Sequence, residues 1–86
     1  NMRSTRSMVT FSKPFLLNGH DGELPAGEYE ILVEEELLQG LSFSAYRRTA
    51  TYLTVHAGGG RTELRQISEV ALDAALAHDR TLLDGQ

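Results

Sequence analysis

Two histidine–aspartate pairs are the side chains in this sequence best suited to holding a metal ion. His20 precedes Asp21 and His78 precedes Asp79, whereas His56 has no acidic neighbour. A zinc site needs three or four ligands that converge at about 2 Å from the metal. One pair is expected in a loop and the other near a helix end, where the helix dipole alone explains a histidine. The pairs therefore point in different directions, and we expect surface or structural roles, with no metal and no cofactor.

A run of three glutamates, Glu34, Glu35 and Glu36, could supply paired carboxylates for acid–base catalysis or cation binding. Successive side chains of a strand point to opposite faces, so at most two of these carboxylates share a side. An acid–base pair also needs a cleft that raises the pKa of one carboxyl group, and no pattern here indicates one. We expect a solvated cluster that pairs with Arg47 and Arg48 across the sheet, and no catalytic residues.

Tyrosines and arginines are interleaved in the second half of the chain, at Tyr46, Arg47, Arg48, Tyr52, Arg61 and Arg65. On an exposed sheet face, aromatic rings stack on nucleobases and guanidinium groups hold phosphates. The net charge of the chain is −4, however, whereas nucleic-acid-binding domains usually present a basic surface. If Tyr52 is exposed, these residues form such a patch. If Tyr52 is buried in the core, the remaining residues are ordinary protein surface. We keep these residues as the candidate surface interaction patch.

Length and composition restrict the class of protein. Eighty-six residues fit one domain, and the absence of cysteine excludes disulfides and thiolate metal sites and indicates a reducing cytoplasm. Residues 1–46 hold three basic and seven acidic side chains, so the acidic excess lies in this half. No apolar run approaches the roughly 20 residues that cross a bilayer. Residues 1–7 do not resemble a secretory leader, and Asn1 before Met2 is typical of a vector remnant.

Alternating and turn-forming residues predict an antiparallel sheet. Residues 8–17 alternate, and Pro14 makes this strand an edge strand or forces a bulge. Residues 28–34 are the clearest strand, with one apolar and one mostly acidic face. The alternation then breaks, which fits either a bulge or a single helical turn, and residues 40–48 are expected to be an irregular connection. Two further strands, 49–56 and 61–67, form a hairpin around a glycine-rich tip.

The last element is predicted to be a helix that begins after Ser68. Serine is a good N-cap, and Glu69 in the first turn complements the helix dipole. Ile67 before the cap and Leu72 fit a hydrophobic staple. The spacing predicts a buried stripe of Leu72, Ala75, Leu76 and Leu83, with Glu69, Asp73 and Arg80 on the solvated side.

Three segments of the chain are similar to one group of proteins. They are residues 11–15 (FSKPF), residues 24–29 (LPAGEY) and residues 35–48 (EELLQGLSFSAYRR). Together they resemble short bacterial conserved hypothetical proteins of unknown function, over about residues 8–80. Because that group has no assigned activity, the resemblance implies no substrate, cofactor or partner.

The sequence thus predicts an α+β fold, with a curled antiparallel sheet of four or five strands and one C-terminal helix. A small, partly open barrel is the main variant. The globular domain is expected to span residues 8–83, after a flexible N-terminus of residues 1–7 and before a tail of residues 84–86. We expect a cytoplasmic protein without membrane contact.

For function, the sequence favours a non-catalytic protein-interaction or accessory module. The reason is that the unpaired edges of a short sheet can be covered by another chain, either a different protein or a second copy in a homodimer. One alternative is single-stranded nucleic-acid binding through the tyrosine–arginine sheet face. A second is a small metal-dependent hydrolase that uses the histidine–aspartate pairs.

Overall fold

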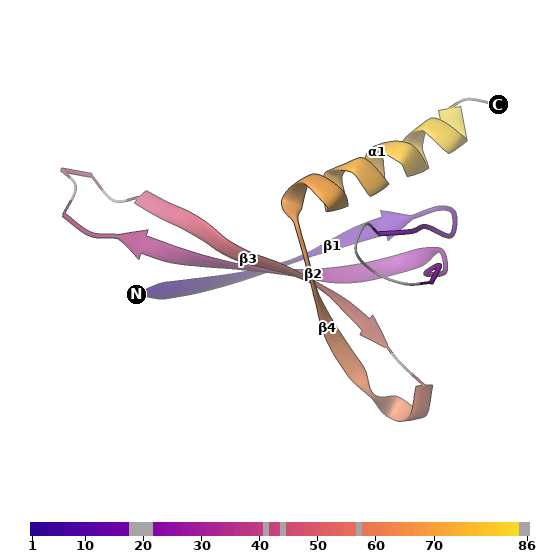
Figure 1. The fold of residues 1–86 in the computed structure, drawn as a ribbon, viewed down its shortest axis with the longest axis horizontal. Coiled ribbons are helices and arrows are strands. Elements are labelled where there is room, and N and C mark those ends of the chain that lie inside the picture. The colour runs from indigo at the N-terminus through magenta and orange to yellow at the C-terminus, as the bar shows by residue number, and fades with distance from the viewer. Residues whose placement is uncertain (18–21, 41, 44, 57, 85–86) are drawn as a thin grey trace.

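The chain forms an open antiparallel sheet with one helix on it (Figure 1). The computed structural model describes residues 1–17, 22–40, 42–43, 45–56 and 58–84, and for residues 82–84 the backbone alone. The elements are β1 (Met2–Phe11), β2 (Gly27–Leu38), β3 (Ala45–His56), a 3-10 turn η1 (Gly58–Gly60), β4 (Thr62–Ile67) and α1 (Glu69–Asp84). The strands are ordered β1-β2-β3-β4, and all neighbours are antiparallel. The predicted α+β class is confirmed, with four strands and without closure into a barrel.

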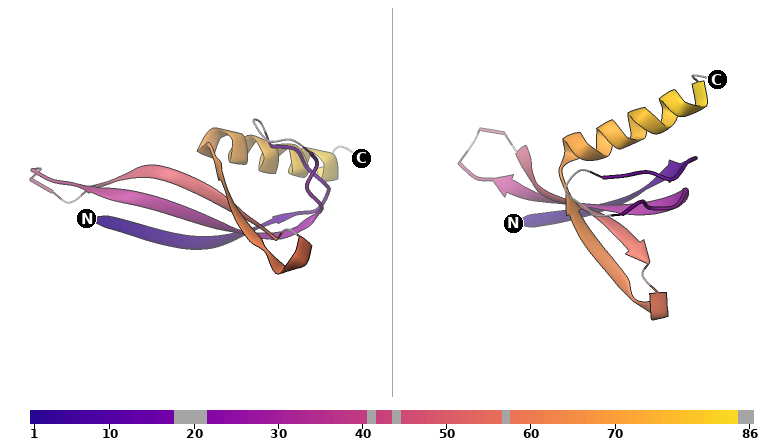
Figure 2. Two further views of the ribbon diagram at one scale, coloured as in Figure 1. Left: turned by 60° about the horizontal axis from the view of Figure 1, so that its bottom comes forward. Right: turned by 45° about the vertical axis from the view of Figure 1, so that its right-hand side comes forward.

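The strongly twisted sheet divides into two ribbons at one end. Pairing of β2 with β3 stops at Ile31 and Leu53, and beyond this point β3 and β4 turn away from β1 and β2 (Figure 1). At the other end, β1, β2 and β3 extend past the start of α1 as a three-stranded projection. We call this projection the arm and define it as residues 2–4, 34–38 and 45–50. Both views of Figure 2 show α1 on one side of the sheet.

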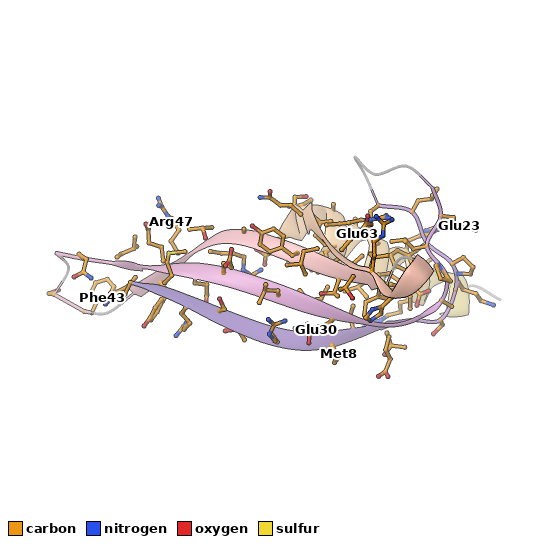
Figure 3. The ribbon with its side chains drawn as sticks, turned by 90° about the horizontal axis from the view of Figure 1, so that it is seen from below. Met8, Glu23, Glu30, Phe43, Arg47 and Glu63 are labelled. Carbon is orange, nitrogen blue, oxygen red and sulfur yellow. The ribbon has the colours of Figure 1, made fainter. Side chains whose placement is uncertain are left out.

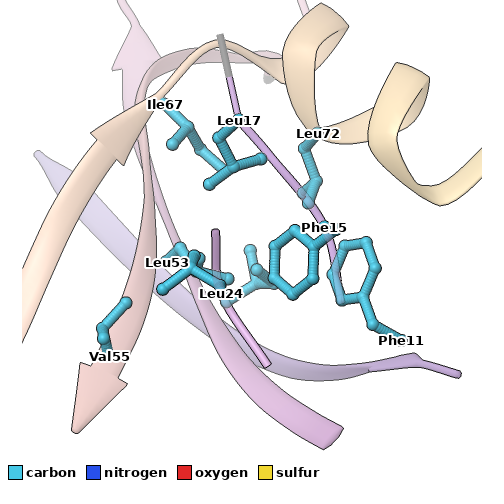
Figure 4. Packing of buried hydrophobic residues seen from close by; sticks show 9 residues of the cluster. Phe11, Phe15, Leu17, Leu24, Leu53, Val55, Ile67 and Leu72 are labelled. Carbon is cyan, nitrogen blue, oxygen red and sulfur yellow. The ribbon is translucent and has the colours of Figure 1, made fainter. Parts of the chain in front are cut away.

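The hydrophobic core lies between α1 and one side of the sheet, which we call the helix side (Figure 4). Its buried members are Phe11, Phe15, Leu17, Leu24, Ile31, Leu53, Val55, Ile67 and Leu72. The long β1–β2 connection supplies three of them, because Phe15 and Leu24 exchange two backbone hydrogen bonds of 2.9 and 2.8 Å. This connection closes the core beneath the helix.

β1 differs from the strand that the alternation predicts, because it begins at Met2 and ends at Phe11 rather than spanning residues 8–17. Residues 2–7, expected as a flexible N-terminus, pair with β2 along their whole length. The sequence pattern did not predict this part of the strand, because its side chains are mostly polar on both faces. The expectation that the strand is an edge strand is confirmed, although Pro14 lies outside it.

Where the pattern breaks after Glu34, β2 contains neither a bulge nor a helical turn, and a β-bulge lies in the neighbouring strand instead. β2 continues to Leu38, while the register shifts because β3 contains one residue, Thr49, with no partner on β2. The Thr49 hydroxyl donates to the Glu34 carbonyl oxygen at 3.2 Å. The predicted irregular connection is therefore wrong for residues 45–48, which pair with β2 as strand.

The helix begins as predicted. The Ser68 side-chain oxygen accepts the N–H of Ala71 at 3.0 Å, so Ser68 is the N-cap of α1. Leu72 is buried, and Ala75 and Leu76 pack against the core. The described part of the buried stripe is thus confirmed, whereas the Leu83 side chain lies outside the described residues, as do residues 85–86 of the predicted tail.

Removing the N-cap gives a first test of the fold. We expect Ser68→Ala to lower the free energy of unfolding by about 1 kcal/mol, because one N–H of the first turn loses its acceptor. Urea denaturation followed by circular dichroism measures the change. The matched control is Ser42→Ala, whose serine is exposed and makes no described side-chain hydrogen bond. Equal effects of the two variants would contradict the capping role.

Candidate interaction surface

The backbone groups of β1 that point away from the sheet can be identified from one hydrogen bond. The Leu37 N–H donates to the Asn1 carbonyl oxygen at 2.8 Å. The register that places Met2 opposite Glu36 makes Asn1 and Leu37 direct partners, so they form a hydrogen-bonded pair. Such pairs alternate with non-hydrogen-bonded pairs along an antiparallel ladder. The odd residues of β1 therefore bond to β2, and the even residues direct their N–H and C=O groups outward.

The outward edge of β1 lacks the features that usually prevent a strand from pairing with another chain. Natural edges are shortened, bulged, interrupted by proline or covered by free charges. β1 has 10 residues and no register shift against β2. Its two charges are held by the neighbouring strand, because Arg3 pairs with Glu35 at 2.9 Å and Arg6 pairs with Glu30 at 2.7 Å. The edge is thus long, regular and electrostatically neutralised.

The other free edges in the described residues are shorter or interrupted. β4, at the opposite side of the sheet, has 6 residues. Residues 45–50 of β3 extend beyond β4, and the bulge at Thr49 interrupts their free edge. β1 is therefore the edge best suited to accept a further strand.

The side of the sheet opposite α1, which we call the open side, carries apolar residues on all four strands, although Leu32 on β2 is only 7% exposed. Leu32 and Tyr52 lie directly opposite each other on β2 and β3. Met8 on β1 and Leu64 on β4 flank them and are 56% and 53% exposed. Figure 3, seen from below, shows Met8 and Glu30 on adjacent strands. A strand added beside β1 would extend this surface.

On the helix side of the arm, one arginine connects all three strands. The Arg3 guanidinium lies 3.6 Å from the centroid of the Tyr46 ring and also pairs with Glu35. Such stacking adds about 0.5–1 kcal/mol at exposed sites. Arg48 pairs with Glu69 at 2.9 Å and thereby ties the arm to the first turn of α1. These contacts support β1 near Arg3 in the unbound chain.

The six residues of the predicted interaction patch do not lie on one surface. The register places Tyr46, Arg48 and Arg65 on the helix side and Arg47 and Tyr52 on the open side, whereas Arg61 precedes β4. Tyr52 is half-buried rather than part of the core cluster.

Three arginines of this set already have carboxylate partners. Arg47 pairs with Glu36 at 2.6 Å, as predicted for the glutamate cluster, whereas Arg48 pairs with Glu69 rather than with that cluster. Arg65 pairs with Glu63 at 3.4 Å. These guanidinium groups are less available for phosphate than an unpaired basic patch would be.

The histidine–aspartate pairs do not come together as one described site. His20 and Asp21 lie outside the described residues, and His78 is exposed. Asp79 is only 6% exposed, and its carboxylate accepts the N–H groups of Ser12 at 3.0 Å and Lys13 at 2.9 Å. Among the residues that the structure describes, no three histidine or acidic side chains are placed to hold a metal ion.

The structural role of Asp79 was not predicted, although the sequence contains a signal for it. Asp79 follows Leu72 by seven positions and therefore belongs to the same helical stripe as Leu72 and Leu76. An acidic residue on a buried stripe needs donors to compensate its desolvation. Those donors come from the chain just after β1, which no local pattern places beneath the helix.

A groove of about 390 Å³ lies between α1 and the segment that follows β1. Its lining includes Pro14, Leu16, Ala71 and Ala74, together with Glu23 and His78.

Away from this groove, burial raises the pKa of the Tyr29 hydroxyl, which donates to the Pro25 carbonyl oxygen at 2.6 Å. A tyrosine in this environment stays protonated and holds the turn before β2.

Comparison of the chain with protein-family models, curated proteins and solved structures finds no match. The resemblance to short bacterial conserved hypothetical proteins stays a prediction. Within the described residues, the one helix is too short and too polar to cross a membrane. The geometry of the sheet edges is therefore the basis for a functional proposal.

Proposed function

We propose that this protein is a non-catalytic interaction module that binds an extended protein segment by adding it as a strand beside β1. The observation that supports this proposal is the regular, unprotected edge of Met2–Phe11, whose even residues direct backbone donors and acceptors outward. Strand addition uses these groups for affinity and alternate side chains for specificity.

The side chains along β1 favour a protein segment of mixed character. Met2 and Met8 are exposed on the open side, and Arg6 between them is paired with Glu30. A partner strand would meet two apolar contacts separated by two polar residues, Ser4 and Arg6. The ion pairs of Arg47, Arg48 and Arg65 support the same choice over nucleic acid, because these groups are already neutralised.

A proline placed on the outward edge tests the proposal. The Ser4 N–H points away from β2, so Ser4→Pro leaves the β1–β2 hydrogen bonds in place but removes one outward donor and blocks close approach. Used as bait in cell extracts of the native host, Ser4→Ala is expected to retain the proteins bound by the wild type. We expect Ser4→Pro to lose them by at least about tenfold in affinity.

Urea denaturation checks that Ser4→Pro is folded, with an expected loss in the unfolding free energy of the unbound chain of about 1 kcal/mol or less, as for an edge position that proline tolerates. Proteins that bind Ser4→Pro and Ser4→Ala equally well would place the binding surface away from β1. That outcome would contradict strand addition.

A further inference from the structure

We infer that the strand bound by β1 is β1 of a second copy of this chain, paired about a two-fold axis at Thr5. This inference rests on the proposed function and names its partner. The two sheets then join into one continuous antiparallel sheet, with both helices on the same side. Antiparallel pairing of identical strands requires the axis to be perpendicular to the sheet, so residues of the same face oppose each other.

The two-fold symmetry allows only a few registers for pairing β1 with its copy near the middle of the strand. Each register is defined by the residue through which the axis passes. An axis at Arg6 places this arginine opposite its own copy, and like charges directly opposite destabilise a sheet. An axis at Ser7 places Arg3 opposite Phe11, next to the segment where Ser12 and Lys13 bind Asp79 beneath α1. That register brings the partner's arm against the connection that closes the core.

An axis at Thr5 avoids both problems. Met2 then opposes Met8, so the exposed methionines of the two copies lie side by side on the open side and contact each other. Thr5 opposes its own copy, a combination that favours antiparallel sheets. Ser4 opposes Arg6, so no two charges face each other. The pairing uses residues 2–8 and leaves Phe11 and the following segment clear.

Two further features favour a second copy over an unrelated strand. Arg3 and Arg6 each have a carboxylate partner within the chain, Glu35 and Glu30, so two copies of β1 can approach with little net charge when no arginine lies directly opposite its own copy. Pairing of β1 with β1 also closes the assembly. The outer strands of the joined sheet are then two copies of β4, each with 6 residues, which are short for further strand addition.

Because the chain contains no cysteine, single substitutions report the register without ambiguity. In the proposed pairing, Thr5 forms a non-hydrogen-bonded pair with its copy, at about 4.5 Å between Cα atoms. This separation lies within the range of disulfides, roughly 4.4–6.8 Å. Under a thiol–disulfide buffer, we expect Thr5→Cys to form covalent dimers. Arg6→Cys and Ser7→Cys report the registers with the axis at Arg6 and at Ser7. We expect these two variants to form at least about tenfold less covalent dimer than Thr5→Cys.

Sedimentation of the unmodified chain, Ser4→Ala and Ser4→Pro separates the second-copy inference from the proposed function. We expect the first two to be dimers at micromolar concentration and Ser4→Pro to be a folded monomer. Preferred cross-linking of Ser7→Cys or Arg6→Cys would overturn the Thr5 axis. If the wild type is a monomer and binds a foreign partner that Ser4→Pro does not bind, the second-copy inference is overturned. Strand addition beside β1 then remains supported. Insensitivity of all binding to Ser4→Pro would overturn both.

Discussion

The Phe11→Ala variant is expected to lose about 4 kcal/mol of unfolding free energy, the largest effect of any single substitution considered for this domain. Phe11 is 1% exposed, and its ring stacks on Phe15 with centroids 3.5 Å apart. The Tyr29 ring meets it edge-on at 6.0 Å. The phenylalanine thus joins β1, β2 and the connection between them, so its removal leaves a cavity that these elements cannot close together.

Chemical denaturation measures the loss from the midpoint and slope of the transition. Since a small domain has about 5–15 kcal/mol in total, Phe11→Leu, with a smaller expected loss, keeps the experiment informative if Phe11→Ala does not fold. Leu16→Ala is the control, because Leu16 is 66% exposed and should change stability by no more than about 0.5 kcal/mol. Similar losses in Phe11→Ala and Leu16→Ala would contradict this description of the core.

Among the substitutions considered, Asp79→Ala is expected to have the second largest effect, with a loss in unfolding free energy of about 3 kcal/mol. Hydrogen bonds to a charged group contribute more than neutral ones, and the substitution leaves the N–H groups of Ser12 and Lys13 without their acceptor. The segment after β1 would then be held beneath α1 by apolar contacts alone. Denaturation gives the total loss, and amide hydrogen exchange at Ser12 and Lys13 locates it.

Asp73→Ala is the matched control, since Asp73 lies on the same helix and is exposed. Asp79→Asn keeps the shape of the side chain but exchanges one acceptor oxygen for an amide donor, which cannot accept the second N–H. Its expected loss is therefore intermediate. An alanine variant as stable as Asp73→Ala would show that the carboxylate does not hold this segment.

Local patterns were sufficient to predict the regular parts of the fold. Alternation in residues 28–34 identified β2, because Tyr29, Ile31 and Val33 face the core cluster and the acidic residues lie on the opposite face. Ser68 and the stripe through Leu72 and Leu76 identified the start and the buried face of α1, since capping and helical periodicity are local properties. Glycines at residues 58–60 marked the turn between β3 and β4.

Features that depend on distant partners were not predictable. The first residues of β1 are mostly polar on both faces, and their backbone pairing and ion pairs with β2, which are contacts with a distant segment, explain why they form a strand. The bulge at Thr49 puts odd-numbered β3 residues on the helix side in the core and even-numbered ones there in the arm, so no single period describes this strand. The candidate edge of β1 could not be predicted for the same reason. Its arginines are neutralised by glutamates of β2, and the sequence does not show that these residues lie side by side.

The arm has a further consequence for motion. None of its residues belongs to the buried cluster, and cross-strand hydrogen bonds and ion pairs are its main support. Segments with few buried apolar contacts open with a smaller free energy than the whole domain. The arm therefore opens and recloses more often than the body of the sheet. A strand bound along β1 would make this opening less frequent. Partner binding and the rigidity of the arm therefore depend on each other.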